Sequence, residues 1–500
     1  MTWDALRGAL AAHGLLRAET GTTDDVCPVA AVTYDSRQAS AGHAFVALRG
    51  QHADGTVFAS DAVARGASLV VSEQPAPASW PTPWIEVTDA RRALAALAAV
   101  CAGHPSHELG LVGITGTNGK TTTAYLLASI FEAAGWPSGV MGTVGYRIGA
   151  DVRAAARTTP EAPDVQSMLR EMVAHGCKAC VMEVSSHALA LHRVDDLRFA
   201  AAVFTNLTRD HLDFHGDMDS YFRAKARLFD MLPAGAPAVI NLDDPRGAGL
   251  AAAAARPVTY AVGRQADVTP GPLAYSLDGL SFDAHTPRGT VHVRSRLVGR
   301  PNVSNILAAV AAADALGLPL PAIEAGLAAL AGVPGRFEVV SDQPDQPTVV
   351  VDYAHTDDAL RNLLETARPL TAGRLITVFG CGGNRDRTKR PLMGVVATRL
   401  SDVVVVTSDN PRLEDPRRII DEVLRGVQAE SRSGHEVRVV LDRGEAIATA
   451  IGLARPGDVV LIAGKGHEKY QEIGGVELPF DDVAVAKQAL AQRTSKTVVS

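Results

Sequence analysis

The chain has 500 residues, of which 47% are hydrophobic and 21% are charged, and its formal net charge at pH 7 is −7. This length predicts about three domains, each able to bury a core of its own. The net negative charge lacks the basic footprint of a protein that binds nucleic acid or an anionic membrane, so we expect neither as a partner.

The sequence shows no secretory signal and no apolar run long enough to span a bilayer. Its five cysteines are scattered, which argues against a disulfide framework and fits a reducing compartment. We therefore expect a soluble, cytoplasmic protein without membrane insertion, and we expect it to be a monomer.

The first block, residues 1–108, predicts a small N-terminal α/β domain. Short apolar runs at 44–48 and 67–71 are typical of strands, and an alanine-rich segment at 90–102 is typical of a helix. The block ends at a His-Pro-Ser sequence, residues 104–106.

A glycine-rich loop opens the second block, residues 109–334. The apolar run 109–114 predicts a buried strand, and apolar residues at helical spacing predict a helix over 121–134, with Gly135 as its stop. Between strand and helix lies the sequence Gly116-Thr117-Asn118-Gly119-Lys120-Thr121-Thr122.

This sequence is a shortened form of the loop that holds nucleotide phosphates, with Ile114 where the usual pattern has glycine. Loop amides and a helix N-terminus present positive partial charge to a polyphosphate. Lys120 can reach the β- and γ-phosphates, and the Thr121 hydroxyl can hold a magnesium ion. An ordinary glycine turn is the alternative, but the flanking strand and helix favour an ATP site.

The rest of the second block predicts a central domain with a parallel sheet. Apolar runs at 179–184, 200–205 and 238–242 alternate with helical stretches, which is the signature of a parallel α/β sheet. Alternating patterns within 268–299 predict a small antiparallel sheet.

Polar residues follow two of these strands, where ligands gather in open α/β sheets. Glu183 ends one strand and is a natural second magnesium ligand beside a phosphate loop. His211, Asp213 and His215 follow the next strand, and we expect a metal role for at least His211. A solvated glutamate and a polar capping loop are the alternatives.

Lys225 lies on the apolar stripe of a predicted helix, whereas Arg223 and Arg227 lie off it. A lysine held against apolar neighbours has a lowered pKa and can be an uncharged nucleophile. From the residues alone, a lysine whose ammonium reaches solvent is the favoured interpretation.

The third block, residues 335–500, predicts a Rossmann-like, doubly wound C-terminal domain. Its strands are expected at 348–352, 375–379, 403–407 and 459–463, separated by helices.

Three polar loops follow strands of this block directly. Their sequences are Asp352-Tyr353-Ala354-His355, Asp409-Asn410-Pro411-Arg412 and Gly464-Lys465-Gly466-His467-Glu468. An arginine can grip a carboxylate with two hydrogen bonds while a carboxylate takes an ammonium group, so these loops suit a zwitterionic ligand. The residues thus predict an ATP- and magnesium-dependent enzyme with a separate domain for an amino-acid-like substrate.

The chain resembles the Mur ligase family of bacterial cell-wall synthesis along its whole length. The residues that carry the resemblance are 115–123, 183–187, 206–211, Lys225, 301–305, 335–338 and the three C-terminal loops. Thr158-Thr159-Pro160 and Asp352-Tyr353-Ala354-His355-Thr356 are similar to the branch that adds the third peptide residue. The Asp409–Arg412 loop resembles members that choose meso-diaminopimelate over lysine, since the distal end of diaminopimelate carries an additional carboxylate.

The resemblance implies three domains, for UDP, ATP and amino-acid binding, and a set of residues for each. ATP would be held by Gly116, Thr117, Asn118, Gly119, Lys120, Thr121, Thr122, Asn302, Arg336 and Asp352. The UDP-sugar and its peptide arm would contact Tyr34, Ser36, Gln51, His52, Ala53, Thr158, Thr159, Ser185 and Arg193. Diaminopimelate would be bound by Arg390, Asp409, Asn410, Pro411, Arg412, Gly464 and Glu468.

The resemblance also implies the metal ligands and the catalytic set. Magnesium would be held by Thr121, Glu183, His211 and Lys225, the last carbamylated so that it offers an anionic oxygen. The catalytic residues would be Lys120, Lys225, His211 and Arg336. Three positions depart from the family pattern: Leu191 replaces glutamine, Arg157 replaces asparagine, and Asp357 replaces the proline after Asp-Tyr-Ala-His-Thr.

The implied reaction joins diaminopimelate to the D-glutamate of UDP-N-acetylmuramoyl-L-alanyl-D-glutamate through an acyl phosphate formed from ATP. Closure of the third domain is expected before chemistry. Alternatives within enzymes are a lysine-adding ligase and a folylpolyglutamate synthase-like ligase. The alternative outside enzymes is a nucleotide-controlled switch, which would leave the metal cluster and the amino-acid loops unexplained.

Overall fold

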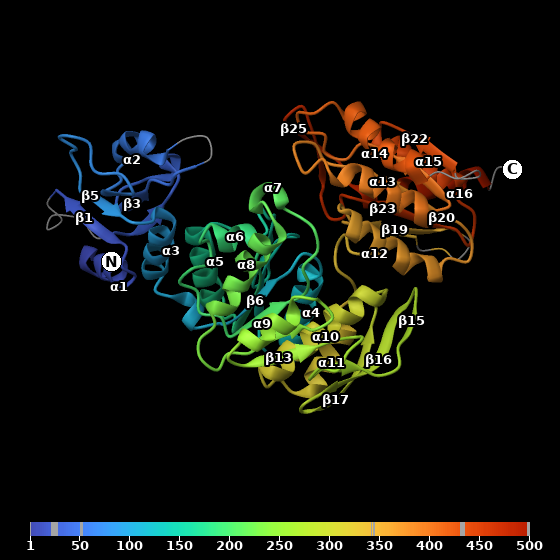
Figure 1. Ribbon diagram of the computed structural model, residues 1–500, viewed down its shortest axis with the longest axis horizontal. Helices are drawn as coiled ribbons and strands as arrows, with labels where there is room; N and C mark the ends of the chain where they lie inside the picture. The colour runs from blue at the N-terminus through green and yellow to red at the C-terminus, as the bar shows by residue number, and fades with distance from the viewer. Residues whose placement is uncertain are drawn as a thin grey trace.

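The computed structural model describes residues 2–21, 29–50, 54–341, 343, 346–430 and 436–497. Figure 1 shows three bodies in chain order, from the blue N-terminal body through a green and yellow central body to an orange and red C-terminal one. The two expectations of an α/β chain and of three sheet-containing parts are confirmed. Within the described ranges, no helix is both long and apolar enough to cross a membrane.

The N-terminal body is a five-stranded sheet with the order β1-β5-β4-β3-β2, in which only the β1–β5 pair is antiparallel. Its strands are β1 (Leu16–Thr20), β2 (Ala31–Thr33), β3 (His43–Val46), β4 (Leu69–Ser72) and β5 (Trp84–Val87). Its helices are α1 (Trp3–Ala12), α2 (Ala59–Ala64) and α3 (Ala90–Cys101). Leu94 and Leu97 of α3 pack with the sheet in one core, so the alanine-rich segment is a buried helix.

The central body is built on an eight-stranded sheet with the order β13-β12-β11-β6-β10-β7-β8-β9. The sheet is parallel from β13 to β7, and β8 and β9 add an antiparallel edge. Its strands are β6 (Gly110–Thr115), β7 (Ser138–Met141), β8 (Tyr146–Ile148), β9 (Asp151–Arg153), β10 (Ala179–Glu183), β11 (Ala201–Phe204), β12 (Ala238–Asn241) and β13 (Pro257–Tyr260). The predicted parallel sheet is therefore confirmed.

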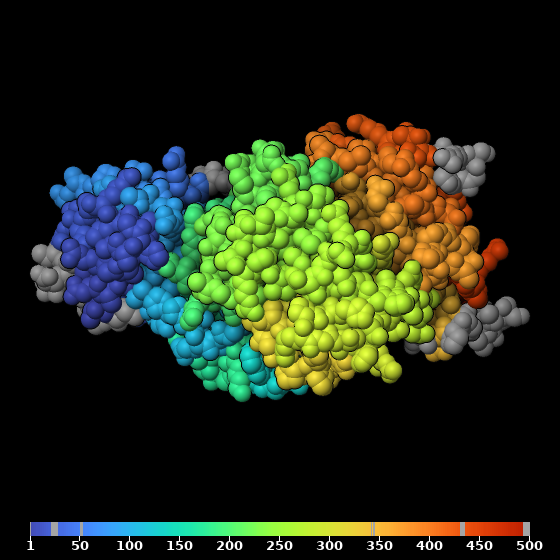
Figure 2. Space-filling model, turned by 60° about the horizontal axis from the view of Figure 1, so that its bottom comes forward, coloured from blue at the N-terminus to red at the C-terminus, as the bar shows by residue number. Residues whose placement is uncertain are grey.

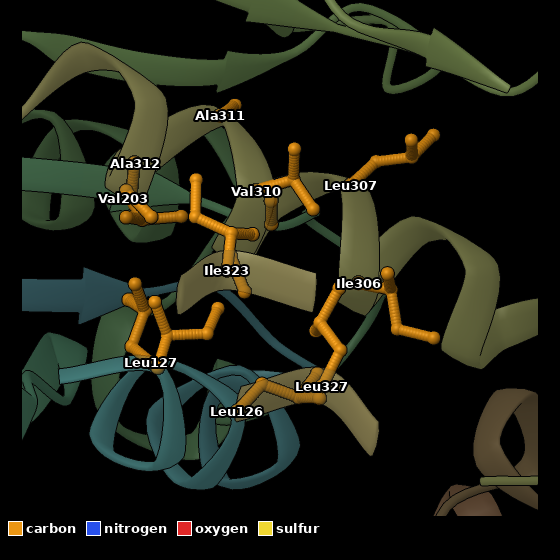
Figure 3. Close-up of a cluster of buried hydrophobic side chains, with 14 of the residues drawn as sticks. Leu126, Leu127, Val203, Ile306, Leu307, Val310, Ala311, Ala312, Ile323 and Leu327 are labelled. Atoms are coloured by element: carbon orange, nitrogen blue, oxygen red, sulfur yellow. The ribbon is translucent and has the colours of Figure 1, made fainter. Parts of the chain in front are cut away.

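Helices cover both faces of this sheet, because successive strand residues point to opposite sides. Val112 of β6 belongs to the core under α4, α10 and α11, whereas Leu111 belongs to the core under α5 and α8. Figure 3 shows the first of these cores, with leucines of α4 facing Ile306, Ile323 and Leu327. The helices are α4 (Lys120–Ala133), α5 (Ala162–Ala174), α6 (Ser186–Ala190), α7 (Leu212–His215), α8 (Met218–Asp230), α9 (Gly247–Ala253), α10 (Arg300–Ala315) and α11 (Leu320–Ala329).

A small four-stranded antiparallel sheet follows β13, as the alternating pattern predicted. Its strands are β14 (Thr269–Pro270), β15 (Ala274–Ser276), β16 (Gly279–Thr286) and β17 (Gly289–Ser295). Along β17 the burial alternates, so that Val291 and Val293 face the core and His292 and Arg294 face solvent.

The C-terminal body has a six-stranded sheet with the order β18-β19-β23-β20-β21-β22, parallel except for β18. Its strands are β18 (Glu338–Val339), β19 (Thr348–Asp352), β20 (Leu375–Phe379), β21 (Val403–Val406), β22 (Glu436–Val439) and β23 (Val459–Ala463), and a hairpin of β24 (Tyr470–Ile473) and β25 (Val476–Pro479) follows. Its helices are α12 (Asp357–Ala367), α13 (Lys389–Leu400), α14 (Pro416–Glu430), α15 (Arg443–Leu453) and α16 (Asp482–Thr497). The predicted doubly wound sheet is confirmed, with separate cores on its two faces.

Strand register brings the polar loops to shared edges. Glu183 at the end of β10 pairs with Ile114 of β6, and Phe204 at the end of β11 pairs with Thr115. In the C-terminal sheet, Asp352 pairs with Ala463. The predicted domain boundaries after residues 108 and 334 fall between these sheets and stay predictions.

Candidate active site

The glycine-rich loop connects β6 to α4 in a backbone conformation that requires glycine at two positions. Gly116 has φ of 152° and Gly119 has φ of 87°. A Cβ atom at Gly116 would lie 1.9 Å from Thr205 Oγ1, and one at Gly119 would lie 2.3 Å from Asn305 Oδ1. The loop is therefore folded tightly against its neighbours, with the N-terminus of α4 at its end.

Lys120, the first residue of α4, folds back over this loop. Its Nζ donates hydrogen bonds to the carbonyl oxygens of Gly116 and Thr117, both at 2.9 Å. Burial lowers the pKa of this ammonium group, and the charge of Glu183 opposes the shift. An anionic ligand above the loop would supply the charge that favours the ammonium form.

Thr121 and Glu183 form a pair of oxygen donors beside the loop. The Thr121 hydroxyl donates to Glu183 Oε2 at 3.0 Å, and the other carboxylate oxygen accepts from the backbone N–H of Thr143 at 2.9 Å. Thr121 is 3% exposed and Glu183 is 1% exposed. A buried hydroxyl and carboxylate at this spacing suit a hard divalent cation.

Arg336 reaches this pair from the C-terminal body. Its Nη2 donates to the Thr121 hydroxyl at 3.2 Å, and its guanidinium lies 4.5 Å from the centre of the Tyr353 ring. Its buried Nη1 has no hydrogen-bond partner among the residues that the structure describes. Asp352 lies behind it, with its carboxylate fixed by the backbone N–H groups of Phe337 and Ala354 at 2.7 and 2.8 Å. Arg336 is thus held in place with one donor still to be used.

His211 lies in a group of aromatic rings that follows β11. Its backbone is left-handed, with φ of 53°, and its Nε2 lies 3.4 Å from Asp210 Oδ2. The rings of His187 and His215 belong to the same group, and the ring centroids of His187 and His211 are 4.8 Å apart. Burial lowers the pKa of His211 to about 3 and that of His215 to about 4. Both imidazoles are therefore neutral near pH 7, which is the form that ligates a metal.

Lys225 on α8 is 2% exposed, so the interpretation that its ammonium reaches solvent is wrong. Its Nζ donates to the carbonyl oxygen of Gly116 at 2.8 Å and lies 4.5 Å from the centre of the Tyr221 ring. Burial, followed by the charge of Lys120, lowers the pKa of Lys225 well below its usual value. The structure thus places a buried amine with a lowered pKa directly beneath the phosphate loop.

The residues predicted for the nucleotide sugar and its peptide lie in two places. Thr158, Thr159 and Ser185 adjoin Glu183: Thr159 Oγ1 donates to the Glu183 carbonyl at 2.8 Å, and Thr158 Oγ1 lies 3.1 Å from the Thr143 hydroxyl. Arg193 Nη1 donates to the Thr159 carbonyl oxygen at 3.2 Å.

Tyr34 and Ser36 belong to the N-terminal body, away from this group. Tyr34 OH lies 3.5 Å from Asp164 Oδ2, and both residues line a separate cavity of about 330 Å³ between β2 and α5. Ser36 begins a short 3-10 helix. Gln51, His52 and Ala53 lie outside the described residues.

The C-terminal loops converge on Lys465, which is fully buried. Its Nζ donates to Asn410 Oδ1 at 2.8 Å and lies 3.2 Å from Glu468 and 3.6 Å from Asp409. The cost of burying the Lys465 ammonium group is offset by the buried Asp409 carboxylate and the partly exposed Glu468 carboxylate. Gly464 has φ of 122° and no room for a Cβ atom beside Asp409. Three residues predicted to bind the amino acid therefore form one unit, preorganised by a lysine whose role sequence reasoning missed.

Arg412 and Arg390 both have carboxylate partners. Arg412 Nε lies 3.0 Å from Glu472 Oε2, and its Nη1 donates to the Gly383 carbonyl oxygen at 2.8 Å. Arg412 follows Pro411 and has φ of 54°. The guanidinium of Arg390 is 0% exposed and pairs with Glu414 and Glu422. A direct contact of Arg390 with substrate stays a prediction, because the structure shows it holding these two carboxylates.

A cavity of about 300 Å³ lies between the central and C-terminal bodies. Among its lining residues are Thr117, Asn118, Gly119, Lys120, Thr121, Thr122, Thr143, Thr158, Glu183, Ser185, Asp210, His211, Asn302, Arg336 and Asp352. Asn302 is oriented by hydrogen bonds to Val298 and Asn305. The predicted ATP and metal residues thus share one chamber, apart from Gly116 and Lys225, which do not line it. Sequence reasoning missed Thr143, which lies two residues after β7, and Asp210, which lies in the loop after β11.

Three family models match the chain in sequence order. They are described as Mur ligase family, catalytic domain (residues 28–100), Mur ligase middle domain (114–313) and Mur ligase, glutamate ligase domain (335–466). A UDP-N-acetylmuramoyl-L-alanyl-D-glutamate--2,6-diaminopimelate ligase of Gloeobacter violaceus is 48% identical and covers 98% of this chain and 99% of its own length. The enzyme of the same name from Geobacter metallireducens is also 48% identical, over 92% of this chain and 94% of its own.

Solved structures agree with these matches. A structure of a UDP-N-acetylmuramoyl-L-alanyl-D-glutamate--2,6-diaminopimelate ligase is 36% identical, covers 93% of this chain and 96% of its own, and has a TM-score of 0.67. MurF from Acinetobacter baumannii has the same TM-score at 23% identity, with coverages of 92% and 95%. E. coli FolC in complex with ADP has a TM-score of 0.58 at 21% identity, with coverages of 80% and 94%. The last two likenesses show the fold alone.

Proposed function

Because this chain belongs to the Mur ligase family, we propose that it adds meso-diaminopimelate to the D-glutamate of UDP-N-acetylmuramoyl-L-alanyl-D-glutamate, in the synthesis of peptidoglycan precursors. It is an ATP-dependent ligase. The observation that carries the proposal is the shared chamber, in which a phosphate loop and Arg336 from another body face the same hydroxyl–carboxylate pair. The chain also covers nearly the full length of relatives with that name.

The first step transfers the γ-phosphoryl group of ATP to the side-chain carboxylate of D-glutamate. The bond between the γ-phosphorus and the bridging oxygen breaks, ADP leaves, and a carboxylate oxygen forms the new bond to phosphorus. Lys120 above the loop and the free Nη1 of Arg336 are placed to balance the charge that develops on the phosphoryl oxygens.

The second step joins the amine of diaminopimelate to the activated carbonyl carbon. The nitrogen attacks the acyl phosphate, a tetrahedral intermediate forms, and inorganic phosphate leaves as the nitrogen loses a proton. Asp409, Asn410 and Glu468 are suited to hold an ammonium group of the substrate, and Arg412 is suited to its distal carboxylate.

The residues of the chamber fit magnesium as a cofactor. Thr121 and Glu183 offer buried oxygen donors 3.0 Å apart, and His211 offers a neutral imidazole. When bound, magnesium would neutralise charge on the transferring phosphoryl group. Carbon dioxide reacts with the neutral form of an amine, and burial lowers the pKa of Lys225 towards that form. We propose that Lys225 is carbamylated and contributes an anionic oxygen to the same site. A cytoplasmic location and a monomeric state remain part of the proposal.

The test is ADP release with UDP-N-acetylmuramoyl-L-alanyl-D-glutamate, with meso-diaminopimelate, L-lysine or no amine supplied in parallel. Turnover with diaminopimelate alone is expected. Turnover with lysine would keep the ligase and refute the role of Arg412 in specificity. ADP release that does not depend on an amine would refute the ligase reaction, and glutamate addition to a folate would point to the polyglutamylating alternative.

A further inference from the structure

Arg209 crosses from the central body to the C-terminal body. It lies between β11 and α7, and its Nη2 donates to Asp357 Oδ1 at 2.8 Å. Its Nη1 donates to Asp386 Oδ2 at 3.2 Å and to the Thr388 hydroxyl at 2.9 Å. The three charged side chains are 29%, 20% and 19% exposed, so water screens them only in part. One guanidinium therefore binds two carboxylates of another body at once.

Both carboxylates lie at the start of a helix. Asp357 is the first residue of α12, and Asp386 precedes α13, where its Oδ1 accepts from the backbone N–H of Thr388 at 2.8 Å. Asp357 belongs to α12, and Asp386 is bonded to the residue before α13, so Arg209 connects the starts of both helices to the loop after β11. That loop continues into Asp210 and His211, which line the chamber.

A second contact lies beside the first. Asn118 of the phosphate loop donates through Nδ2 to Asp358 Oδ2 at 3.0 Å. The N-terminus of α12 is thus attached both to the phosphate loop and to the loop after β11. Figure 2 shows the orange C-terminal body packed directly against the central one on the face it presents.

We propose that Arg209 is a positioning residue, a latch to Asp357 and Asp386 that holds the C-terminal body over the chamber. Resting on the proposed function, the latch fixes the distance between the amine in the C-terminal body and the acyl phosphate in the central one. A small misplacement of two reacting groups costs a large part of the rate. The hydrogen bonds of Arg209 within the described residues go to Asp357, Asp386 and Thr388, so its effect on the reaction is transmitted through the position of the C-terminal body.

Asp357 makes the latch testable within this chain. It stands where the resembling motif has proline, and both residues are favourable at the first position of a helix. Thr356 before it has φ of −122° and ψ of 161°, a conformation that tolerates a following proline. Asp357→Pro should therefore keep α12 while removing the carboxylate, and Asp357→Asn removes only the charge.

The experiment is a double-mutant cycle on the full-length protein with Arg209→Gln, Asp357→Asn and the double variant, with Asp357→Pro alongside. We expect kcat/KM for diaminopimelate to fall about 10-fold in each single variant while KM for ATP stays within about 2-fold. The Asp357→Asn effect should vanish in the Arg209→Gln background. Arg368→Gln, which breaks a pair with Asp402 inside the C-terminal body, is the matched control and should leave both constants unchanged.

Additive effects of the two substitutions would overturn the latch, because a role of Asp357 at the start of its helix does not depend on Arg209. Equal losses for ATP and diaminopimelate would also overturn it. X-ray scattering of the ligand-free protein is the independent measurement. The radius of gyration should increase in Arg209→Gln and not in Arg368→Gln. If the wild-type protein shows no amine-dependent turnover, the proposed function fails. In that case an unchanged radius of gyration in Arg209→Gln would still refute the latch by itself.

Discussion

Lys225 combines complete burial with a single polar contact, the Gly116 carbonyl oxygen at 2.8 Å. If it supplies a carbamate oxygen to the metal, Lys225→Ala should lose turnover by about 100-fold or more while the affinity for ATP changes little, since second-layer and ligand losses at metal sites reach this size. Added short carboxylic acids should restore part of the activity. Steady-state kinetics and nucleotide titration measure the two quantities separately.

Arg223→Ala is the control for this variant, because Arg223 lies on the same helix, is exposed and donates a hydrogen bond to Ser220 of its own helix. It should match the wild-type protein in both assays. Retained turnover in Lys225→Ala would show that the buried amine serves packing alone, and a nucleotide switch would also retain its ATP response.

At the residue scale, the sequence predicted ligand types better than it predicted their surroundings. Lys120, Thr121 and Glu183 were predicted correctly as neighbours, because strand ends and a short loop determine their positions. The burial of Lys225 depends on β6 and the phosphate loop, which lie far away in the chain. Gly116, its hydrogen-bond partner, is 109 residues away in sequence. The hydrophobic stripe indicates which face is buried but not how deeply.

The phosphate loop is an element whose shape depends on glycine. Gly119→Ala would place a methyl group 2.3 Å from Asn305 Oδ1 at φ of 87°, and such strain costs about 1–3 kcal/mol. We therefore expect weaker ATP binding and a lower free energy of unfolding. Gly249→Ala, in α9 with nothing within 4 Å, should be neutral or stabilising by about 0.5–1 kcal/mol. Urea unfolding and nucleotide titration of the pair check this, and equal behaviour would contradict it.

Helices α13 and α14 are joined by the buried guanidinium of Arg390. Its hydrogen bonds lower the pKa of Glu414 from 4.5 to about 2. Because the folded-state pKa is the lower one, the pair stabilises the protein fully above about pH 4.5, and this stability is lost as the pH falls towards 2. The stabilisation that the Arg390–Glu414 pair contributes is at most about 3 kcal/mol. Arg390→Met should lower the free energy of unfolding at pH 7 and flatten its decline below pH 5, measured by urea unfolding.

Arg399→Met is the control, because Arg399 joins the same two helices through Glu430 but is 53% exposed. Exposed pairs contribute about 0–1 kcal/mol, so its pH profile should follow the wild-type one. A profile of Arg390→Met parallel to the wild-type profile would show that Arg390 does not stabilise through Glu414, and would favour its predicted role as a substrate ligand.

Strands were predicted well where a continuous apolar run in the sequence becomes a buried strand. The runs before the loops became β6, β10, β19 and β23, since apolar strands between helices are buried on both faces. The antiparallel edge of β8 and β9 was not predicted, because its three-residue strands include one that is exposed throughout. Such a strand leaves no hydrophobic alternation in the sequence.

The arrangement of the three bodies is the level at which sequence reasoning stops. Arg336, Asn118 and Arg209 each cross between the central and C-terminal bodies, and no local pattern marks a residue for such a contact. The resemblance implied an ATP site shared between domains, and the structure adds which atoms meet. Tyr34 and Ser36, which are predicted to contact the nucleotide sugar, do not line the chamber.

The shared chamber leads to a prediction for the whole molecule. A non-hydrolysable ATP analogue should slow amide hydrogen exchange in residues 116–122 and also in 336–337 and 352–355, because these segments supply lining residues of the cavity. At 100 times Kd, such a ligand stabilises the bodies it joins by about 2.7 kcal/mol. Strands β4 and β5 of the N-terminal body should exchange at unchanged rates, and their buried core serves as the internal control. Protection confined to 116–122 would mean that the C-terminal body does not hold the nucleotide, and Arg336 would then lose its place in the proposed phosphoryl transfer.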